Sequence, residues 1–313
     1  MARSRSSDRV STCFSPFRMV DAMTTAVGRD LLALDDLTRA DLLAILKRAQ
    51  DFAGYWSERR MPQSLSGKRI ALIVNDGGWR NTTAFDLGVN SMGGLCVHTP
   101  LRLGHGEAVA DLANYLDNWI DAVVSRTPDL GTLRALAEAA DAPVINARTK
   151  QNHPCETLGD LAFYWHRHGT IDAIKVVIVA PDANILGSWI EAARVLPLKV
   201  VQVYPERWHV TRETSAAFRS STDLGELRDA DIVVTDCWPD GGHPDELSGY
   251  RITAAILDDL HREHLEFLPC PPVTRDQEVS ADAMLHAKCR VIDAKAFLLH
   301  AQNAALEWVF RKI

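Results

Sequence analysis

The sequence has no uninterrupted apolar run that approaches the roughly 20 residues of a membrane-spanning helix. It also has no excess of basic residues: 34 lysines and arginines stand against 41 aspartates and glutamates, a net charge of -7. Nucleic-acid binding depends on clustered cations that neutralise phosphates, so this balance argues against it. We therefore expect a soluble chain whose partners include neither a membrane nor nucleic acid.

Cysteine pairs at metal-binding spacing are also missing. The six cysteines form no Cys-x-x-Cys motif, which argues against a structural zinc site or a thioredoxin motif. They are scattered over the chain, at Cys13, Cys96, Cys155, Cys237, Cys270 and Cys289. Free thiols in a reducing compartment are the default for such spacing, so we expect a cytoplasmic protein without a bound metal.

Residues 1–28 differ in composition from the rest of the chain. The first 22 residues contain four arginines, five serines and only two acids, which resembles an organelle import segment. A disordered tail, or translation that begins at Met23, would explain this composition equally well. In each case we expect the segment to lie outside the fold, and an import signal stays open as an alternative to a purely cytoplasmic location.

The remaining chain alternates between apolar segments of strand length and segments with helical periodicity. Apolar strands are predicted at residues 69–74, 121–125, 142–146, 175–180, 200–204, 231–235 and 265–268. Helices are predicted at residues 42–52, 107–116, 131–140, 184–196, 250–261 and 294–310, and another from about Asn81. Strands that are apolar on both faces and separated by helices indicate parallel sheets covered on both sides.

The pattern restarts near residue 167, and 313 residues correspond to about two domains of typical size. We therefore predict an α/β fold with two doubly wound parallel-sheet domains and a cleft between them. The first domain should span residues 29–166 and the second residues 167–293. The final helix, within residues 294–313, should cross back to pack on the first domain.

The candidate site lies in four loops that follow predicted strands, because open α/β sheets bind ligands beyond the carboxyl ends of their strands. In the first loop, residues 75–83, glycines let the backbone approach a ligand, and the next helix offers its N-terminus to an anion. Arg80 lies in the first turn of that helix, where a bound anion would explain an arginine that opposes the helix dipole. Anion binding and a plain glycine turn are both consistent with this loop alone.

The other three loops carry further polar residues. One strand ends in Arg126, which could enter the same pocket or remain an ordinary surface charge. His153 precedes a helix, where it could donate to a substrate oxygen or simply cap that helix. Residues 235–240 and 268–272 lie in the second half of the chain and would face these groups across the cleft.

Taken in order, these loops resemble the motifs of the aspartate/ornithine carbamoyltransferase family, and the similarity runs from about Leu31 to Trp308. That family has a phosphate loop Ser-x-Arg-Thr-Arg, a strand that ends in Arg, and a His-Pro-(Thr/Cys)-Gln motif. Its ornithine branch adds Asp-x-Trp and His-Cys-Leu-Pro. The corresponding segments here are Gly78-Trp-Arg-Asn-Thr82, Asp121-Ala-Val-Val-Ser-Arg126, His153-Pro-Cys-Glu156, Asp236-Cys-Trp238 and Pro269-Cys-Pro-Pro272.

The resemblance implies transfer of a carbamoyl group from carbamoyl phosphate to an amine in amino-acid biosynthesis, with the donor bound by the first domain and the acceptor by the second. It makes Arg80, Arg126 and His153 the catalytic residues, which neutralise the phosphate and polarise the carbonyl oxygen. The implied contacts of carbamoyl phosphate are Gly78, Trp79, Arg80, Asn81, Arg126, His153, Glu156, Cys270 and Pro271. Those of the acceptor are Asn184, Asp236, Asp240 and Cys270.

The resemblance also implies a homotrimer, in which the loop at residues 100–107 reaches the active site of the neighbouring subunit. It implies no cofactor and no metal ion, because carbamoyl phosphate is already an activated donor. The partners are then small molecules, namely carbamoyl phosphate and an amine or amino acid.

The chain departs from the family pattern at several contact positions. In the phosphate loop, Gly78, Asn81 and Thr82 replace Ser, Thr and the second Arg. Further replacements fall at Pro269, residues 240–242 and residues 296–298. The sequence therefore predicts a divergent carbamoyltransferase for an amine other than ornithine itself. A catalytically silent paralogue that binds a ligand or a partner, and a transferase with a different donor, stay open.

Glu156 is the most informative departure, because a carboxylate replaces the Gln that contacts the carbamoyl group in the family. An ionised carboxylate near a phosphate dianion is unfavourable. Three outcomes would relieve this: Glu156 is protonated, it pairs with an arginine, or the true donor carries a cationic nitrogen. The first two keep carbamoyl phosphate as the donor and are favoured, because Arg80 and Arg126 remain.

Overall fold

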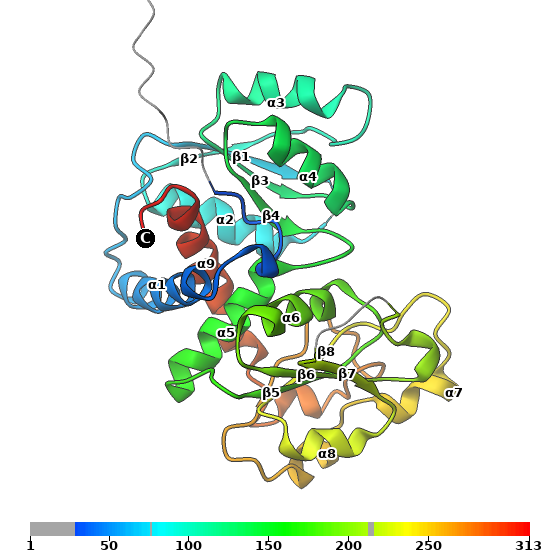
Figure 1. Cartoon of the computed structure of the whole chain (residues 1–313). Helices are drawn as coiled ribbons and strands as arrows, with labels where there is room; N and C mark the ends of the chain where they lie inside the picture. The colour runs from blue at the N-terminus through cyan, green and yellow to red at the C-terminus, as the bar shows by residue number, and fades with distance from the viewer. Residues whose placement is uncertain (1–28, 76, 212–215) are drawn as a thin grey trace, which may run out of the picture.

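The computed structural model describes residues 29–75, 77–211 and 216–313. The expectations for residues 1–28, a disordered or import-directing tail, lie outside these described residues. Figure 1 shows two halves, each built around its own sheet, with α5 (Pro154–His168) and α9 (Val291–Val309) where the halves meet.

The first half contains a parallel sheet with the strand order β2-β1-β3-β4. Its strands are β1 (Arg69–Val74), β2 (Leu95–His98), β3 (Ala122–Arg126) and β4 (Val144–Arg148). The helices that connect them are α2 (Trp79–Ser91), α3 (Val109–Asp117) and α4 (Leu130–Ala139). The sequence analysis does not predict β2, a strand of only four residues at the edge of the sheet.

The second half contains a parallel sheet with the strand order β7-β6-β5-β8-β9. Its strands are β5 (Lys175–Val179), β6 (Lys199–Val203), β7 (Phe218–Ser221), β8 (Ile232–Thr235) and β9 (Glu266–Phe267). Its helices are α6 (Asn184–Val195), α7 (Pro244–Leu247) and α8 (Ala254–Asp259). In both sheets the strand order reverses direction next to a central strand, as in doubly wound domains, so the predicted fold class is confirmed.

One predicted helix, at residues 250–261, is wrong in extent. Residues 248–250 form a separate 3-10 turn, and Ile252 pairs with Val279 in extended conformation. The helix proper begins only after Thr253, whose side chain accepts a hydrogen bond from the N–H of Ile256. A polar N-cap residue thus sets the start of α8 later than the apolar periodicity indicates.

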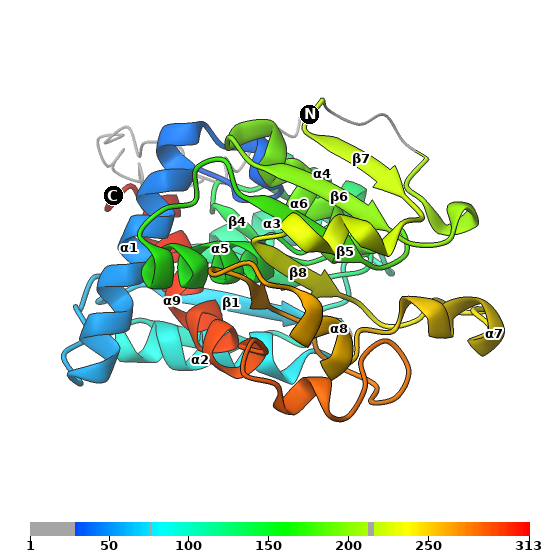
Figure 2. The same ribbon diagram turned by 90° about the horizontal axis from the view of Figure 1, so that it is seen from below.

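The C-terminal helix α9 crosses back to the first half, as predicted. Figure 2 shows it close to α1 (Arg39–Ser57), α2 and α5, and all three helices contact it. In α9, Glu307 accepts two hydrogen bonds from the guanidinium of Arg48 in α1, at 2.6 and 3.1 Å. This bidentate ion pair joins the two ends of the described chain.

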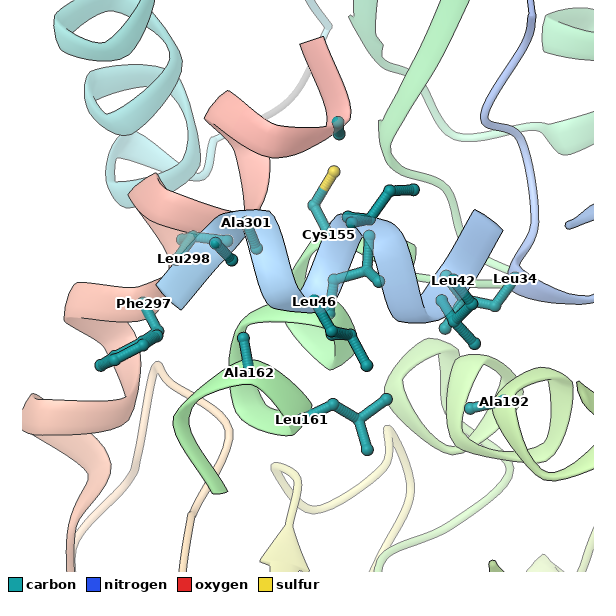
Figure 3. Packing of buried hydrophobic residues seen from close by; sticks show 14 of the residues in the cluster. Leu34, Leu42, Leu46, Cys155, Leu161, Ala162, Ala192, Phe297, Leu298 and Ala301 are labelled. Carbon is teal, nitrogen blue, oxygen red and sulfur yellow. The ribbon is translucent and has the colours of Figure 1, made fainter. Parts of the chain in front are cut away.

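One hydrophobic core runs between the two halves. In Figure 3, Leu46 of α1 lies near Leu161 of α5, and Leu298 of α9 belongs to the same cluster. Helices α5 and α9 approach closely at Gly159, where a Cβ atom would lie 3.1 Å from the backbone of Leu298. Because α5 contacts both α1 of the first half and α6 of the second, the boundary at residue 166 stays a prediction, as does the one at residue 293.

A buried polar network also connects the halves next to the cleft. Glu191 of α6 accepts hydrogen bonds from the backbone N–H of Leu34 at 3.0 Å and from the side chain of Asn152 at 2.9 Å. Burial raises the pKa of Glu191 to about 7, while these hydrogen bonds oppose the shift.

Within residues 29–75, 77–211 and 216–313, no helix combines the length and the apolar character needed to cross a membrane.

Candidate active site

The candidate active site is a cavity of about 530 Å³ between the two halves. It lies where strands β3, β4 and β8 end and where helices α2, α5 and α6 begin. Of the described residues that the sequence analysis predicts for the site, those in its wall are Gly78, Trp79, Arg80, Asn81, Arg126, His153, Glu156, Asn184, Asp236, Cys270 and Pro271. Loops far apart in the sequence therefore meet in one pocket, at the position expected for open α/β sheets.

Gly78 and Arg126 are packed directly against each other. Gly78 is the N-cap of α2, and its φ of 91° falls in the left-handed region that favours glycine. A Cβ atom at this position would lie 2.5 Å from Cζ of Arg126. The glycine that stands in place of the family's serine therefore leaves room for a guanidinium at the N-terminus of α2.

Replacing Gly78 by alanine should displace Arg126 from this position. We expect inorganic phosphate to bind at least about tenfold more weakly to Gly78→Ala in calorimetric titration, the loss that one charge-assisted hydrogen bond produces. Gly77→Ala is the matched control, because a Cβ atom there meets nothing within 4 Å. Equal phosphate affinity in both variants and the wild type would show that this contact does not hold Arg126 in a binding position.

Trp79 and Arg80 form the outer lip of the cavity. Cζ of Arg80 lies 4.8 Å from the centroid of the Trp79 ring, which is a cation–π contact. Trp79 remains 67% exposed, so the indole orients the guanidinium without closing the cavity. Arg80 and the N-terminus of α2 together make this side of the cavity favourable for an anion.

Asn81 also lines the cavity, but its side chain is engaged in the core. Its amide donates to the carbonyl of Ala147 at 2.9 Å, and its oxygen accepts from Gln302 at 2.8 Å. The side chain thus ties α2 to β4 and α9. A contact of Asn81 with carbamoyl phosphate stays a prediction. Because the side chain is engaged in the core, the backbone N–H of Asn81 would make this contact; it is one of the first four N–H groups of α2, which have no partner within the helix.

His153 lies in the cavity wall as the residue before α5, with 8% of its surface exposed. Its backbone N–H donates to Oγ of Ser188 at 2.8 Å, while Nδ1 has no hydrogen-bond partner among the described residues. Burial lowers the pKa of His153 to about 4, although the nearby Glu156 opposes the shift. The imidazole is therefore neutral near pH 7 and can donate one hydrogen bond to a ligand oxygen.

Glu156 belongs to a buried charged triad that reaches from α5 to α9. The ammonium of Lys295 lies 2.7 Å from Oε1 of Glu156 and 2.6 Å from Oδ1 of Asp160. Glu156 and Asp160 are one turn apart on α5, so a single lysine can contact both. In the described chain the ion pair of Glu156 is with Lys295, while the charge of Arg80 also stabilises the carboxylate.

The triad leaves Glu156 ionised. Burial alone would raise the pKa of Glu156, but the attraction of Lys295 outweighs burial and leaves the pKa below its ordinary value. The alternative of a protonated Glu156 is therefore not supported. For Asp160, burial prevails over Lys295 and raises the pKa to about 6. Sequence analysis misses Lys295, although a lysine within an apolar helix is a signal for a buried ion pair.

Asp236 and Asn184 bring the second half of the protein into the cavity. Oδ1 of Asp236 accepts the N–H of Cys237 at 2.8 Å, so this residue caps the turn after β8 while it lines the cavity. Burial raises the pKa of Asp236. The side chain of Asn184 donates to the carbonyl of Thr149 in the first half, at 3.2 Å. Both residues thus lie across the cleft from Arg80 and Arg126.

A second cavity of about 400 Å³ adjoins the first on its outer side. The two cavities share Arg148, Asn184, Asp236 and Cys237 in their walls. Of the predicted acceptor contacts in the described chain, Asp240 lines only this outer cavity. Sequence analysis does not single out Arg148, although it ends an apolar strand in the same way as Arg126.

Cys270 and Pro271 border the cavity from the loop that follows β9. The backbone N–H of Cys270 donates to the carbonyl of Thr235 at 2.9 Å, which holds this loop beside the end of β8. Burial raises the pKa of the Cys270 thiol well above its ordinary value. Cys270 is therefore a neutral thiol near pH 7 and not an activated nucleophile.

One group of side chains in the described chain has the donor types and spacing of a metal site. The ligand atoms of Asp86, Cys96 and His98 lie within 4.8 Å of one another. These residues lie on α2 and the edge strand β2, apart from the residues that line the catalytic cavity.

The fold and the cavity define a class of two-domain α/β protein with a polar cavity between the two halves, lined by arginines of the first half and by Asp236 of the second. Two family models match the chain in this arrangement. Residues 29–166 match the carbamoyl-P binding domain of aspartate/ornithine carbamoyltransferase, and residues 172–309 match its Asp/Orn binding domain. The chain belongs to the aspartate/ornithine carbamoyltransferase family.

Curated relatives agree with this assignment over nearly the whole chain. The anabolic ornithine carbamoyltransferase of Pyrococcus furiosus is 29% identical over 309 residues, which cover 92% of this chain and 98% of the relative. The ornithine carbamoyltransferase of Acinetobacter baumannii (strain AYE) is 28% identical over 299 residues, 91% of this chain and 97% of the relative.

Solved structures of the same family share the fold. The ornithine carbamoyltransferase from Pyrococcus furiosus has a TM-score of 0.85 at 28% identity and covers 92% of this chain and 98% of its own. The enzyme from Burkholderia thailandensis has a TM-score of 0.84 at 25% identity, with 90% and 98% covered. The predicted resemblance to the ornithine branch is confirmed, and the low identity agrees with a divergent member.

Proposed function

We propose that the protein transfers a carbamoyl group from carbamoyl phosphate to an amine of an ornithine-like or other amino-acid-type acceptor. The observation that carries this proposal is that Arg80, Arg126 and His153, from three separate loops, line one cavity together with Asp236 of the opposite half. Membership of a carbamoyltransferase family supports the type of reaction.

The donor would bind on the side of the first half. Arg80 and Arg126 neutralise the phosphate, because guanidinium groups pair with its oxygens through two hydrogen bonds at once. The neutral His153 donates a hydrogen bond to the carbonyl oxygen. That hydrogen bond strengthens as negative charge develops on the oxygen in the tetrahedral intermediate.

The transfer step needs no group beyond the two substrates and these side chains. The unprotonated amine of the acceptor attacks the carbonyl carbon, and a carbon–nitrogen bond forms. The bond between this carbon and the bridging phosphate oxygen then breaks, and the departing phosphate takes the proton that the nitrogen releases. Alignment of two bound substrates alone supplies on the order of 7–11 kcal/mol of the lowered barrier.

Replacing Glu156 by glutamine should tighten the binding of carbamoyl phosphate. The substitution removes a negative charge from the cavity wall, while Asp160 remains as the partner of Lys295. Like charges about 4 Å apart repel by roughly 4 kcal/mol at an effective dielectric of 20, and less at longer distance. We therefore expect the Kd of carbamoyl phosphate to fall by up to about tenfold in calorimetric titration.

Asp245→Asn is the control for Glu156→Gln, because it removes an exposed carboxylate of α7 at a distance from the cavity wall. It should leave the Kd unchanged. Weaker donor binding in Glu156→Gln, or loss of activity with the fold intact, would mean that the carboxylate itself is required. The donor would then carry a cationic nitrogen, which is the third outcome considered for this residue.

Two measurements test the proposed reaction. Calorimetric titration with carbamoyl phosphate should give saturable binding, and a screen of amines with carbamoyl phosphate should give a carbamoylated product by mass spectrometry. Saturable binding without product from any amine would favour a catalytically silent paralogue. No binding of carbamoyl phosphate or phosphate at millimolar concentration would refute the donor assignment.

We also propose a homotrimer with shared active sites. An apolar groove of about 570 Å³ opens beside the catalytic cavity and shares Trp79, Arg80 and Pro271 with it. In its wall, Trp79 is 67% and Ile292 80% exposed, and contiguous exposed apolar surface is typical of an interface. The loop at residues 100–107 is mostly exposed and would reach the neighbouring cavity.

Sedimentation velocity tests the trimer. We expect a species of three times the chain mass of 34.6 kDa at micromolar concentration. A monomer under these conditions would refute the shared active sites, and the apolar groove would then need another occupant.

A further inference from the structure

Arg148 occupies a position equivalent to that of a predicted catalytic residue. It ends β4 and is paired in register with Arg126, which ends β3. Because parallel strands present their carboxyl ends at one edge of the sheet, both arginines lie at the floor of the same cleft. The catalytic cavity therefore contains a third arginine beside Arg80 and Arg126.

The three arginines border different parts of the cleft. In the described chain, Arg80 and Arg126 line the inner cavity and are not in the wall of the outer one, whereas Arg148 lines both. The wall of the outer cavity also contains the charged residues Lys150, Arg207 and Asp240. Arg148 thus lies where the two cavities adjoin, because it is in the walls of both.

Asp236 reaches the same place from the second half, because it also lines both cavities. Burial raises the pKa of Asp236, and Arg148 is one of the charges that oppose this shift, so the two groups are close enough to interact. A guanidinium from one half and a carboxylate from the other are complementary to a molecule that carries both a carboxylate and an amine.

We propose that Arg148 binds a carboxylate of the acceptor and thereby selects an amino acid over the corresponding simple amine. This inference rests on the proposed carbamoyl transfer. A guanidinium binds a carboxylate through two parallel hydrogen bonds, which fix its position as well as its charge. A site built for such a partner rejects analogues that lack it, because its polar groups are then left without a partner. The amine of the bound acceptor would face Asp236 and the inner cavity.

The test compares acceptors that differ only by the carboxylate. Suitable probes are ornithine with 1,4-diaminobutane, lysine with 1,5-diaminopentane, and 2,4-diaminobutyrate with 1,3-diaminopropane. Each pair is assayed with carbamoyl phosphate on the wild type, on Arg148→Met and on Arg148→Lys. Arg134→Met, an exposed arginine of α4 in the same half, is the matched control. Thermal unfolding and the calorimetric Kd of carbamoyl phosphate are measured on every protein.

We expect the wild type to prefer the amino acid of the best pair. In Arg148→Met, the ratio of kcat/KM between amino acid and amine should fall at least about tenfold. The fall should come from a higher KM of the amino acid, with the Kd of carbamoyl phosphate unchanged. Arg148→Lys should retain part of the preference, since it keeps the charge but not the planar fork.

Three results would overturn the inference while carbamoyl transfer stands. These are a wild type that prefers the simple amine, an unchanged ratio in Arg148→Met, and a weaker carbamoyl phosphate affinity in Arg148→Met without a change in the ratio. The last would place Arg148 in the donor subsite. If the wild type neither binds carbamoyl phosphate nor modifies any amine, the proposed function itself fails, and the role of Arg148 fails with it.

Discussion

Replacing Lys295 by methionine is expected to lower the free energy of unfolding by about 3–5 kcal/mol at pH 7.5. Lys295 lies between the carboxylates of Glu156 and Asp160, and all three side chains are buried. The substitution keeps most of the volume but leaves two negative charges without their cation. Removing one partner of a buried ion pair costs more than the pair is worth, because the remaining charge stays desolvated. Urea unfolding followed by circular dichroism measures the change.

Two controls separate the charge effect from loss of packing. Lys47→Met is the same substitution on the exposed side of α1, and it should change the stability by less than about 0.5 kcal/mol. The triple variant Lys295→Met, Glu156→Gln, Asp160→Asn removes every charge of the triad and should recover much of the loss. If Lys295→Met is as stable as Lys47→Met, the triad does not hold α9 against α5.

The decrease in the free energy of unfolding caused by Lys295→Met should also depend on pH. The titration of Glu156 and Asp160 determines whether this decrease grows or shrinks as the pH rises. The lowered pKa of Glu156 means that its ion pair stabilises the wild type above pH 4.5, and this contribution is lost as the pH falls through the folded pKa. The raised pKa of Asp160, about 6 against 3.8 unfolded, lowers the stability as the pH rises through that range. Without Lys295 both pKa values should rise, so protonation rescues the variant in acid. The stability difference between variant and wild type should therefore shrink from pH 8 to pH 5.

The candidate site was predictable from sequence wherever a polar residue follows a buried strand. Arg126 is the last residue of β3, and Asp236 directly follows β8; both strands are largely apolar. Because the strands of each sheet are parallel, their carboxyl ends lie at one edge of that sheet. His153 precedes a helix that starts at Pro154, a residue suited to the first helical turn. These local rules place each group without any knowledge of its neighbours.

Contacts between distant helix faces were not predictable in the same way. The periodicity of residues 294–310 predicts a helix, but it does not tell which residue of α5 faces Lys295. The same limit applies to Gly78. The need for a glycine at this position is explained only by the guanidinium of Arg126, which packs against it in the folded protein. Arg148 was missed for a different reason, because the predicted strand ends at residue 146, whereas β4 continues to Arg148.

Replacing His153 by alanine is expected to lower kcat by about 100- to 1,000-fold, the usual cost of removing one hydrogen-bond donor to a developing oxyanion. The hydrogen bond of His153 should be stronger in the transition state than in the bound donor, because charge develops on the carbonyl oxygen during attack. The Kd of carbamoyl phosphate should therefore change much less than kcat. The measurement is the rate of carbamoylated product with the best acceptor from the amine screen, together with calorimetric titration of the donor.

The protonation state of His153 gives this prediction a second readout. Burial lowers the pKa of His153 to about 4, so the imidazole stays neutral and able to donate between pH 5 and pH 8. The kcat of the wild type should therefore show no step near pH 6.5 from this residue. His153→Asn, whose amide can still donate, should retain more activity than His153→Ala.

His166→Ala, on the exposed side of the same helix, is the matched control and should keep kcat within about twofold. A loss of less than threefold in His153→Ala would remove this residue from the catalytic step, and a loss confined to the Kd of carbamoyl phosphate would make it a binding residue only.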